Sequence, residues 1–137
     1  MNTAEILYKG GLRAESIHLR SGNVIVTDAP VDNHGKGEAF SPTDLAATSL
    51  GICMVTVMGI LADAHNIDID GTRITIMKHM GSDPRRISGI DVDLYMPDRD
   101  YSDKEKKMLE HTAYNCPVAK SLHPDIVQNV KFHWKNL

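Results

Sequence analysis

The sequence has few of the features that mark disulfide-stabilised, nucleic-acid-binding or secreted proteins. It contains 2 cysteines in 137 residues, too few for a disulfide framework. Its net charge is −3 and no basic block dominates, so neither nucleic acid nor an anionic membrane is expected as its main partner. Residues 1–11 include no apolar stretch of signal-peptide length, so we expect a cytoplasmic protein. In that reducing compartment a cysteine pair is more often redox-active or metal-binding than structural.

The rest of the composition predicts one compact α+β domain. The chain is 42% hydrophobic, and no linker or change in composition divides residues 1–137. Residues 4–20 and 23–30 are rich in β-forming residues and predict an opening hairpin. Alternating apolar residues in 86–97 predict a strand with one buried face. We therefore expect antiparallel sheet around a long central helix, with a second helix later in the chain.

The strongest helix signal begins at Ser41. Ser41, Pro42 and Asp44 provide an N-cap hydroxyl, a first-turn proline and an acid at the third helical position, which is a capping box. The helix is expected to run from about Pro42 to about Ala64. Its residues 45–62 carry no charge, which reaches the lower limit for a membrane span. Polar residues and glycines dilute this stretch and acids flank it, so we expect a soluble helix that a second subunit helps to cover.

One of the two cysteines lies where a short helix is expected to begin. Ser102 and Glu105 form a second capping box, which predicts an amphipathic helix before this point. Cys116 then precedes Pro117 and occupies the N-cap of a helix expected to end near residue 122. Free backbone N–H groups and the helix dipole favour an anion there, so the pKa of Cys116 is expected to fall toward neutrality. Lys120, one turn along, either adds to this field or points away.

The other cysteine, Cys53, lies in the middle of the apolar helix. It is either a buried structural thiol or, if the two helices pack together, the redox partner of Cys116. The sequence alone leaves that contact open. A metal site would instead combine Cys116 with His111 and His123, or Cys53 with His65. These spacings match none of the compact Cys/His patterns of structural zinc sites.

Three segments together resemble the OsmC/Ohr family of osmotically induced and organic hydroperoxide resistance proteins, in its OsmC-like branch. They are "GGLRAE" at 10–15, "SPTDLAATSLGIC" at 41–53 and "NCPVAKSL" at 115–122. They occur in the family's order and roughly at its spacing. The resemblance implies an OsmC-like α+β fold, an intertwined homodimer and two active sites at the subunit interface.

The resemblance also implies a thiol peroxidase that reduces organic hydroperoxides. Cys53 would be the peroxidatic thiolate, and Cys116 would resolve its sulfenic acid as a disulfide. Arg13 would stabilise the thiolate and orient the peroxide, with Arg20 as a weaker candidate. No bound cofactor or metal is implied, and an external dithiol, such as a lipoylated protein, would reduce the disulfide. The alternative is a non-catalytic or small-molecule-binding OsmC-like dimer whose thiols are vestigial.

The carboxylate of the resembled site is where this sequence departs from the family. The best-established peroxidases have a glutamate ten residues before the first cysteine, and this chain has Thr43 there. Asp44 matches the acid of the broader OsmC-like branch. Helical geometry places Asp44 about 13 Å along the axis from Cys53 and about 180° around it, so the two cannot touch within one chain. Asp44 therefore either holds an arginine at the other subunit's site or only caps the helix.

Four apolar residues near Cys53 allow two interpretations. Leu50, Met54, Met58 and Ile60 either line a pocket suited to an alkyl or lipid hydroperoxide or pack as ordinary core.

Overall fold

The computed structural model describes residues 1–135, which fall into two compact units. The first unit comprises residues 1–46, and the second begins at Ala47. Each unit is described separately below, and the prediction of a single domain over residues 1–137 stays a prediction.

The first unit is built on a three-stranded antiparallel sheet with the order β1-β2-β3. Its strands are β1 (Ala4–Gly10), β2 (Arg13–His18) and β3 (Val24–Asp28), and a 3₁₀ turn, η1 (Val31–Asn33), follows them. The predicted hairpin is confirmed for β2 and β3. Residues 4–20 form two strands rather than a single arm of that hairpin, because the chain reverses at Gly10 and Gly11, whose φ angles are 82° and 62°. Glycine adopts this left-handed conformation without steric cost.

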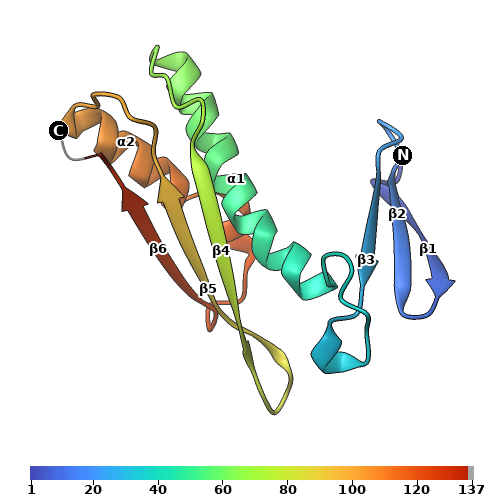
Figure 1. Ribbon diagram of the computed structural model, residues 1–137. Helices are drawn as coiled ribbons and strands as arrows, with labels where there is room; N and C mark the ends of the chain where they lie inside the picture. The colour runs from blue at the N-terminus through green and yellow to red at the C-terminus, as the bar shows by residue number, and fades with distance from the viewer. Residues whose placement is uncertain (136–137) are drawn as a thin grey trace. The chain divides into compact units, whose positions relative to one another are not determined.

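The second unit packs helices on one face of a second three-stranded sheet (Figure 1). Its elements are α1 (Pro42–Ala64, whose first residues belong to the first unit), β4 (Arg73–Gly81), β5 (Arg86–Tyr95), α2 (Asp103–Tyr114), α3 (Pro117–Ser121) and β6 (Val127–His133). Strands β4 and β5 are antiparallel, as predicted. Strands β5 and β6 are parallel, contrary to the antiparallel expectation. The connection through α2 and α3 is long enough to return the chain to the starting end of the sheet, which parallel pairing requires.

Helix α1 has the predicted bounds because its N-terminal cap forms as expected. The Asp44 amide donates to Ser41 Oγ at 3.0 Å, and the Ser41 amide donates to Asp44 Oδ2 at 3.1 Å. Two of the N–H groups that a helix start leaves unpaired are thereby satisfied. The second capping box, between Ser102 and Glu105, begins α2 in the same way.

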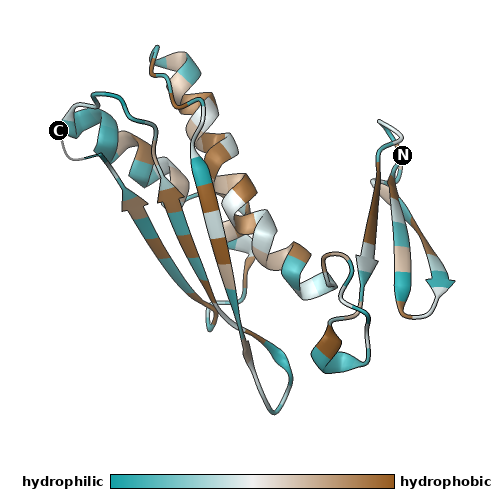
Figure 2. Ribbon diagram, in the orientation of Figure 1, coloured by the Kyte–Doolittle hydropathy of each residue, from teal (hydrophilic) through white to brown (hydrophobic). Residues whose placement is uncertain are grey.

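The core lies between α1, α2 and the inner face of the β4-β5-β6 sheet. The side chains that are entirely buried are Ala47, Leu50, Met54 and Met58 of α1, Ile90, Val92 and Leu94 of β5, Leu109 and Ala113 of α2, and Cys116. Helix α1 approaches β4 closely at Gly51, where an added Cβ would lie 2.9 Å from Ile76 Cδ1. Apolar residues nevertheless continue around α1 (Figure 2). Ile52 and Ile60 are 56% and 67% exposed, so part of this helix is uncovered in the single chain.

Within residues 1–135, α1 is the one helix long and apolar enough to cross a membrane by length and composition. A single such helix is weak evidence for a span, because core helices of soluble proteins meet the same criteria.

Candidate active site

The structure brings the two cysteines together in the second unit. Cys53, near the middle of α1, is partly exposed and packs against the core, whereas Cys116 is entirely buried in it. Both are free thiols. The Cys53 side chain lies close enough to Cys116 to raise the pKa of its thiol. The contact that the sequence left open is therefore present, and no other chain is needed to form it.

Cys116 occupies the predicted N-cap position of α3. Its Sγ accepts a hydrogen bond from the Ala119 amide at 3.4 Å, and Pro117 begins the helix. Burial nevertheless raises the pKa of the Cys116 thiol, and the backbone bond from Ala119, which acts in the opposite direction, does not outweigh it. The negative charge of a Cys53 thiolate raises this pKa further. The expectation that the pKa of Cys116 falls toward neutrality is wrong, because the thiol is withdrawn from water.

The pKa of Cys116 determines which sulfur keeps a proton when one of the pair ionises. A buried thiol beside a second, partly exposed sulfur is the harder of the two to charge. Burial therefore favours the neutral thiol of Cys116 beside Cys53. Lys120 is exposed on α3.

Arg13 lies in the first unit and forms a two-pronged ion pair with Asp28. Its Nε donates to Asp28 Oδ1 at 2.7 Å, and its Nη2 donates to Asp28 Oδ2 at 2.8 Å. Arg13 holds the pKa of the Asp28 carboxyl below its usual value, even though burial acts in the opposite direction. Arg20 is exposed in the turn after β2. The structure thus pairs Arg13 with Asp28 in one unit and Cys53 with Cys116 in the other.

Asp28 is a residue that motif reasoning missed. It is a cross-strand partner of Arg13, because β2 and β3 form a hairpin in which Ile17 pairs with Val24 and Arg13 with Asp28. Extending the register of the predicted hairpin from its turn would have placed these two side chains opposite each other.

The structure confirms the capping role of Asp44, through the hydrogen bonds with Ser41 described above. Thr43 Oγ1 lies 3.3 Å from Ser41 Oγ, so the threonine at the family's glutamate position takes part in the same cap. A catalytic role for Asp44 stays a prediction.

The four apolar residues considered as a pocket lining divide into two groups. Leu50, Met54 and Met58 are fully buried and pack as core. Ile60 is exposed and stays available to contact a substrate or a second subunit.

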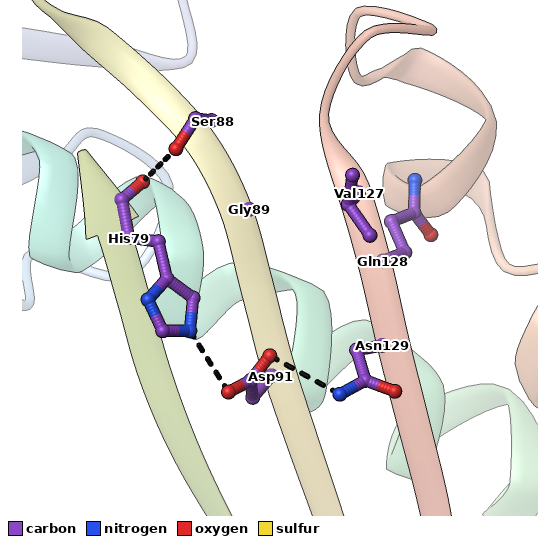
Figure 3. A pocket seen from close by; sticks show the side chains of 7 residues that line it. All are labelled: His79, Ser88, Gly89, Asp91, Val127, Gln128 and Asn129. Atoms are coloured by element: carbon purple, nitrogen blue, oxygen red, sulfur yellow. Dashed lines mark hydrogen bonds and ion pairs between the residues drawn. The ribbon is translucent and has the colours of Figure 1, made fainter. Parts of the chain in front are cut away.

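A shallow hollow of about 370 Å³ lies on the outer face of the β4-β5-β6 sheet, opposite the helices (Figure 3). His79 Nε2 lies 2.8 Å from Asp91 Oδ2, and Asn129 Nδ2 donates to Asp91 Oδ1 at 3.4 Å. The bond from His79 lowers the pKa of Asp91 despite partial burial. The Ser88 hydroxyl donates to the His79 carbonyl at 3.2 Å. These polar groups bond one another, an arrangement typical of a solvated sheet face.

Among residues 1–135, no group of three or more His, Cys, Asp or Glu side chains could hold a metal ion. The histidines considered with the cysteines, namely His65, His111 and His123, are all exposed.

Comparison with known proteins identifies what this arrangement resembles. The family model described as OsmC-like protein matches residues 35–131. A protein of Psychrobacter arcticus 273-4, provisionally named an osmotic stress induced and detoxification response protein, is 53% identical. Its structure aligns with a TM-score of 0.93 over 97% of this chain and 96% of that one. No curated protein matches.

Two more distant structures bear on the fold. An organic hydroperoxide resistance protein OsmC of Legionella pneumophila is 15% identical, with a TM-score of 0.74 over 96% of this chain and 97% of that one. The organic hydroperoxide resistance protein OhrB of Bacillus subtilis is 18% identical, with a TM-score of 0.67 over 96% and 98% of the two chains.

Proposed function

Because the chain belongs to the OsmC/Ohr family, we propose that it is a thiol peroxidase that reduces organic hydroperoxides to alcohols. The observation that carries the proposal is the contact between Cys53 and Cys116. Two free thiols from distant parts of the chain meet, one partly exposed and one fully buried. A contact of this kind suits a peroxidatic cysteine beside its resolving cysteine.

In the first step, the Cys53 thiolate attacks the terminal oxygen of the hydroperoxide. An S–O bond forms, the O–O bond breaks, and the leaving alkoxide takes up a proton to become the alcohol. The sulfur is oxidised to sulfenic acid and the peroxide is reduced. Cys53 suits this role because it is the more accessible of the two thiols.

In the second step, Cys116 attacks the Cys53 sulfenic sulfur. The S–S bond forms, the S–OH bond breaks, and the proton that Cys116 held leaves with the hydroxide as water. The raised pKa of Cys116 supports this order of events, since Cys116 remains a thiol until there is a sulfenic acid to resolve. An external dithiol, such as a lipoylated protein, then reduces the disulfide.

The surroundings of Cys53 support an apolar substrate. Ile52 is next to Cys53, Ile60 lies two turns along the same helix, and both side chains are more than half exposed. Burying an alkyl group against such side chains contributes about 25 cal/mol per Å² of apolar surface. Hydrogen peroxide has no alkyl group with which to gain from this contact.

The proposal includes a homodimer in the cytoplasm, with Arg13 as the cation that stabilises the thiolate. It needs no bound cofactor or metal, and it assigns neither nucleic acid nor membrane as a partner. Asp44 would serve the partner's site in addition to capping α1.

The deciding experiment measures consumption of cumene hydroperoxide in the presence of dithiothreitol. We expect turnover by the wild type and none by Cys53→Ser. Cys116→Ser is the matched control. Assayed without dithiothreitol, it keeps the first step and should consume about one peroxide per subunit, stopping at the sulfenic acid without forming a disulfide. Equal rates for wild type and Cys53→Ser would remove the proposal. A ligand-dependent rise in Tm without turnover would favour the small-molecule-binding alternative.

A further inference from the structure

We propose that Asp28 on β3 is a positioning residue of the active-site arginine, Arg13, in a chain that has Thr43 at the position of the family's glutamate on α1. This inference rests on the proposed function, in which Arg13 stabilises the Cys53 thiolate and orients the peroxide. Asp28 itself does not touch the substrate. It fixes the guanidinium so that one edge is held and the other edge remains available.

The hydrogen bonds define which edge is held. Asp28 accepts from Nε and Nη2 of Arg13, both within 2.8 Å, so its carboxylate lies against the side edge of the guanidinium. Nη1 takes no part in this pair. The Arg13 side chain is 40% exposed and that of Asp28 only 3%, so the anion is enclosed and the cation remains accessible. A planar guanidinium bonded at two points loses much of the freedom to rotate about its terminal bonds.

The carboxylate is itself fixed by the loop that follows β3. The Glu38 amide donates to Asp28 Oδ2 at 3.1 Å, and the Asp28 amide donates to the Phe40 carbonyl at 3.1 Å. The loop between Asp28 and Glu38 is folded tightly on itself, since a Cβ at Gly35 would lie 1.7 Å from the Ala29 carbonyl oxygen. Asp28 is therefore held from its backbone and from its carboxylate.

The position that carries the family's glutamate is occupied here by Thr43, which contacts Ser41. Threonine has no charge with which to orient a guanidinium. Asp28 has both the charge and the geometry, and it reaches Arg13 from the neighbouring strand rather than from the helix.

Two explanations of how Asp28 acts predict opposite effects of Asp28→Asn on the Cys53 thiolate. In one, only the charge of Asp28 matters; in the other, Asp28 positions Arg13. If only charge mattered, removing the carboxylate would leave Arg13 more positive in its surroundings and favour the Cys53 thiolate. If Asp28 positions Arg13, the guanidinium of the variant loses its fixed orientation and favours the thiolate less.

The test measures the rate of Cys53 alkylation by iodoacetamide against pH, with the modified peptide quantified by mass spectrometry. For Asp28→Asn we expect the midpoint of the alkylation profile to rise by about one pH unit. We also expect kcat/KM for cumene hydroperoxide to fall on the order of ten- to a hundredfold. Glu38→Gln is the matched control. It also removes one negative charge near Arg13, 3.9 Å from Nη2, but leaves the two-pronged pair intact. It should behave as wild type.

Arg13→Lys keeps the test decisive if Asp28→Asn fails to fold. Lysine retains the charge but cannot form the two-pronged pair, so it should reproduce the rise in midpoint. An unchanged or lowered midpoint in Asp28→Asn, or a wild-type profile in Arg13→Lys, would overturn the role of Asp28. Arg13→Ala separates this failure from that of the proposed function. If Arg13→Ala shifts the profile and Asp28→Asn does not, only the role of Asp28 falls. If Arg13→Ala also has no effect, the role of Arg13 in the proposed function falls with it.

Discussion

At the scale of single residues, two opposing effects act on Cys116. The Ala119 amide donates to its sulfur and favours the thiolate, while burial in the core favours the neutral thiol. Burial is the larger effect, so the pKa of Cys116 is raised. In the proposed reaction this property protects Cys116 from reacting with peroxide directly, because the thiolate is the reactive form.

The two cysteines should therefore differ in reactivity toward a small alkylating reagent. At pH 7 to 8 we expect iodoacetamide to modify Cys53 at least about tenfold faster than Cys116, because Cys116 is both protonated and buried. The ratio should shrink as pH rises toward the raised pKa of Cys116. Mass spectrometry of the two cysteine peptides after brief exposure gives both rates. Equal modification at neutral pH would contradict this assignment.

The residues of the site differ in how far sequence could predict them. Motifs located Cys53 and Cys116, which the structure brings together, and the N-cap position of Cys116 follows from the proline after it. A motif also contains Arg13, whose role at the site stays a prediction. The direction of the pKa shift of Cys116 did not follow, since burial depends on tertiary packing. Asp28 belongs to no motif and becomes visible only when the strand register is extended from the turn.

At the scale of elements, local sequence signals predicted the bounds of the helices better than the direction of strand pairing. The bounds of α1 follow from a capping box, which involves residues three apart in sequence. The parallel pairing of β5 and β6 joins residues such as Val92 and Val130. Alternation shows that each is a strand but carries no information on the direction of its neighbour.

The two capping boxes should contribute unequally to stability. Ser41→Ala is expected to lower the free energy of unfolding by about 2 kcal/mol and Ser102→Ala by about 0.5 to 1 kcal/mol. The reason is burial: Ser41 is 1% exposed, whereas water can replace the hydroxyl of the exposed Ser102. Urea unfolding followed by circular dichroism measures both losses. A larger loss for Ser102→Ala would show that burial does not govern the strength of these caps.

At the scale of the whole molecule, each unit leaves apolar surface uncovered. In the first unit, Ile6 and Tyr8 of β1 are 69% and 64% exposed. In the second, Ile52 and Ile60 of α1 are exposed. A three-stranded sheet or an apolar helix face normally packs against another layer. The proposed homodimer would supply such layers.

Charge placed on the uncovered face of α1 should therefore dissociate the proposed dimer. For Ile52→Asp and Ile60→Asp we expect the dimer dissociation constant to rise at least about a hundredfold, because an unpaired carboxylate is costly to bury. Analytical ultracentrifugation over a concentration series measures the constant.

Val127→Asp is the control for this experiment. Val127 is 65% exposed but lines the hollow on the outer sheet face, away from α1. Its variant should associate as wild type does. Loss of the dimer in Val127→Asp alone would place the dimer interface on the outer sheet face instead of on α1. A monomeric wild type would exclude the proposed dimer.

The sulfur of Cys116 also caps the N-terminus of α3, a helix of 5 residues. Drawing that sulfur into a bond with Cys53 would take it away from the Ala119 amide that it now accepts from. Hydrogen–deuterium exchange at this one amide would then speed up on oxidation and slow again on reduction. The exchange rate of this amide would therefore report the oxidation state of the cysteine pair.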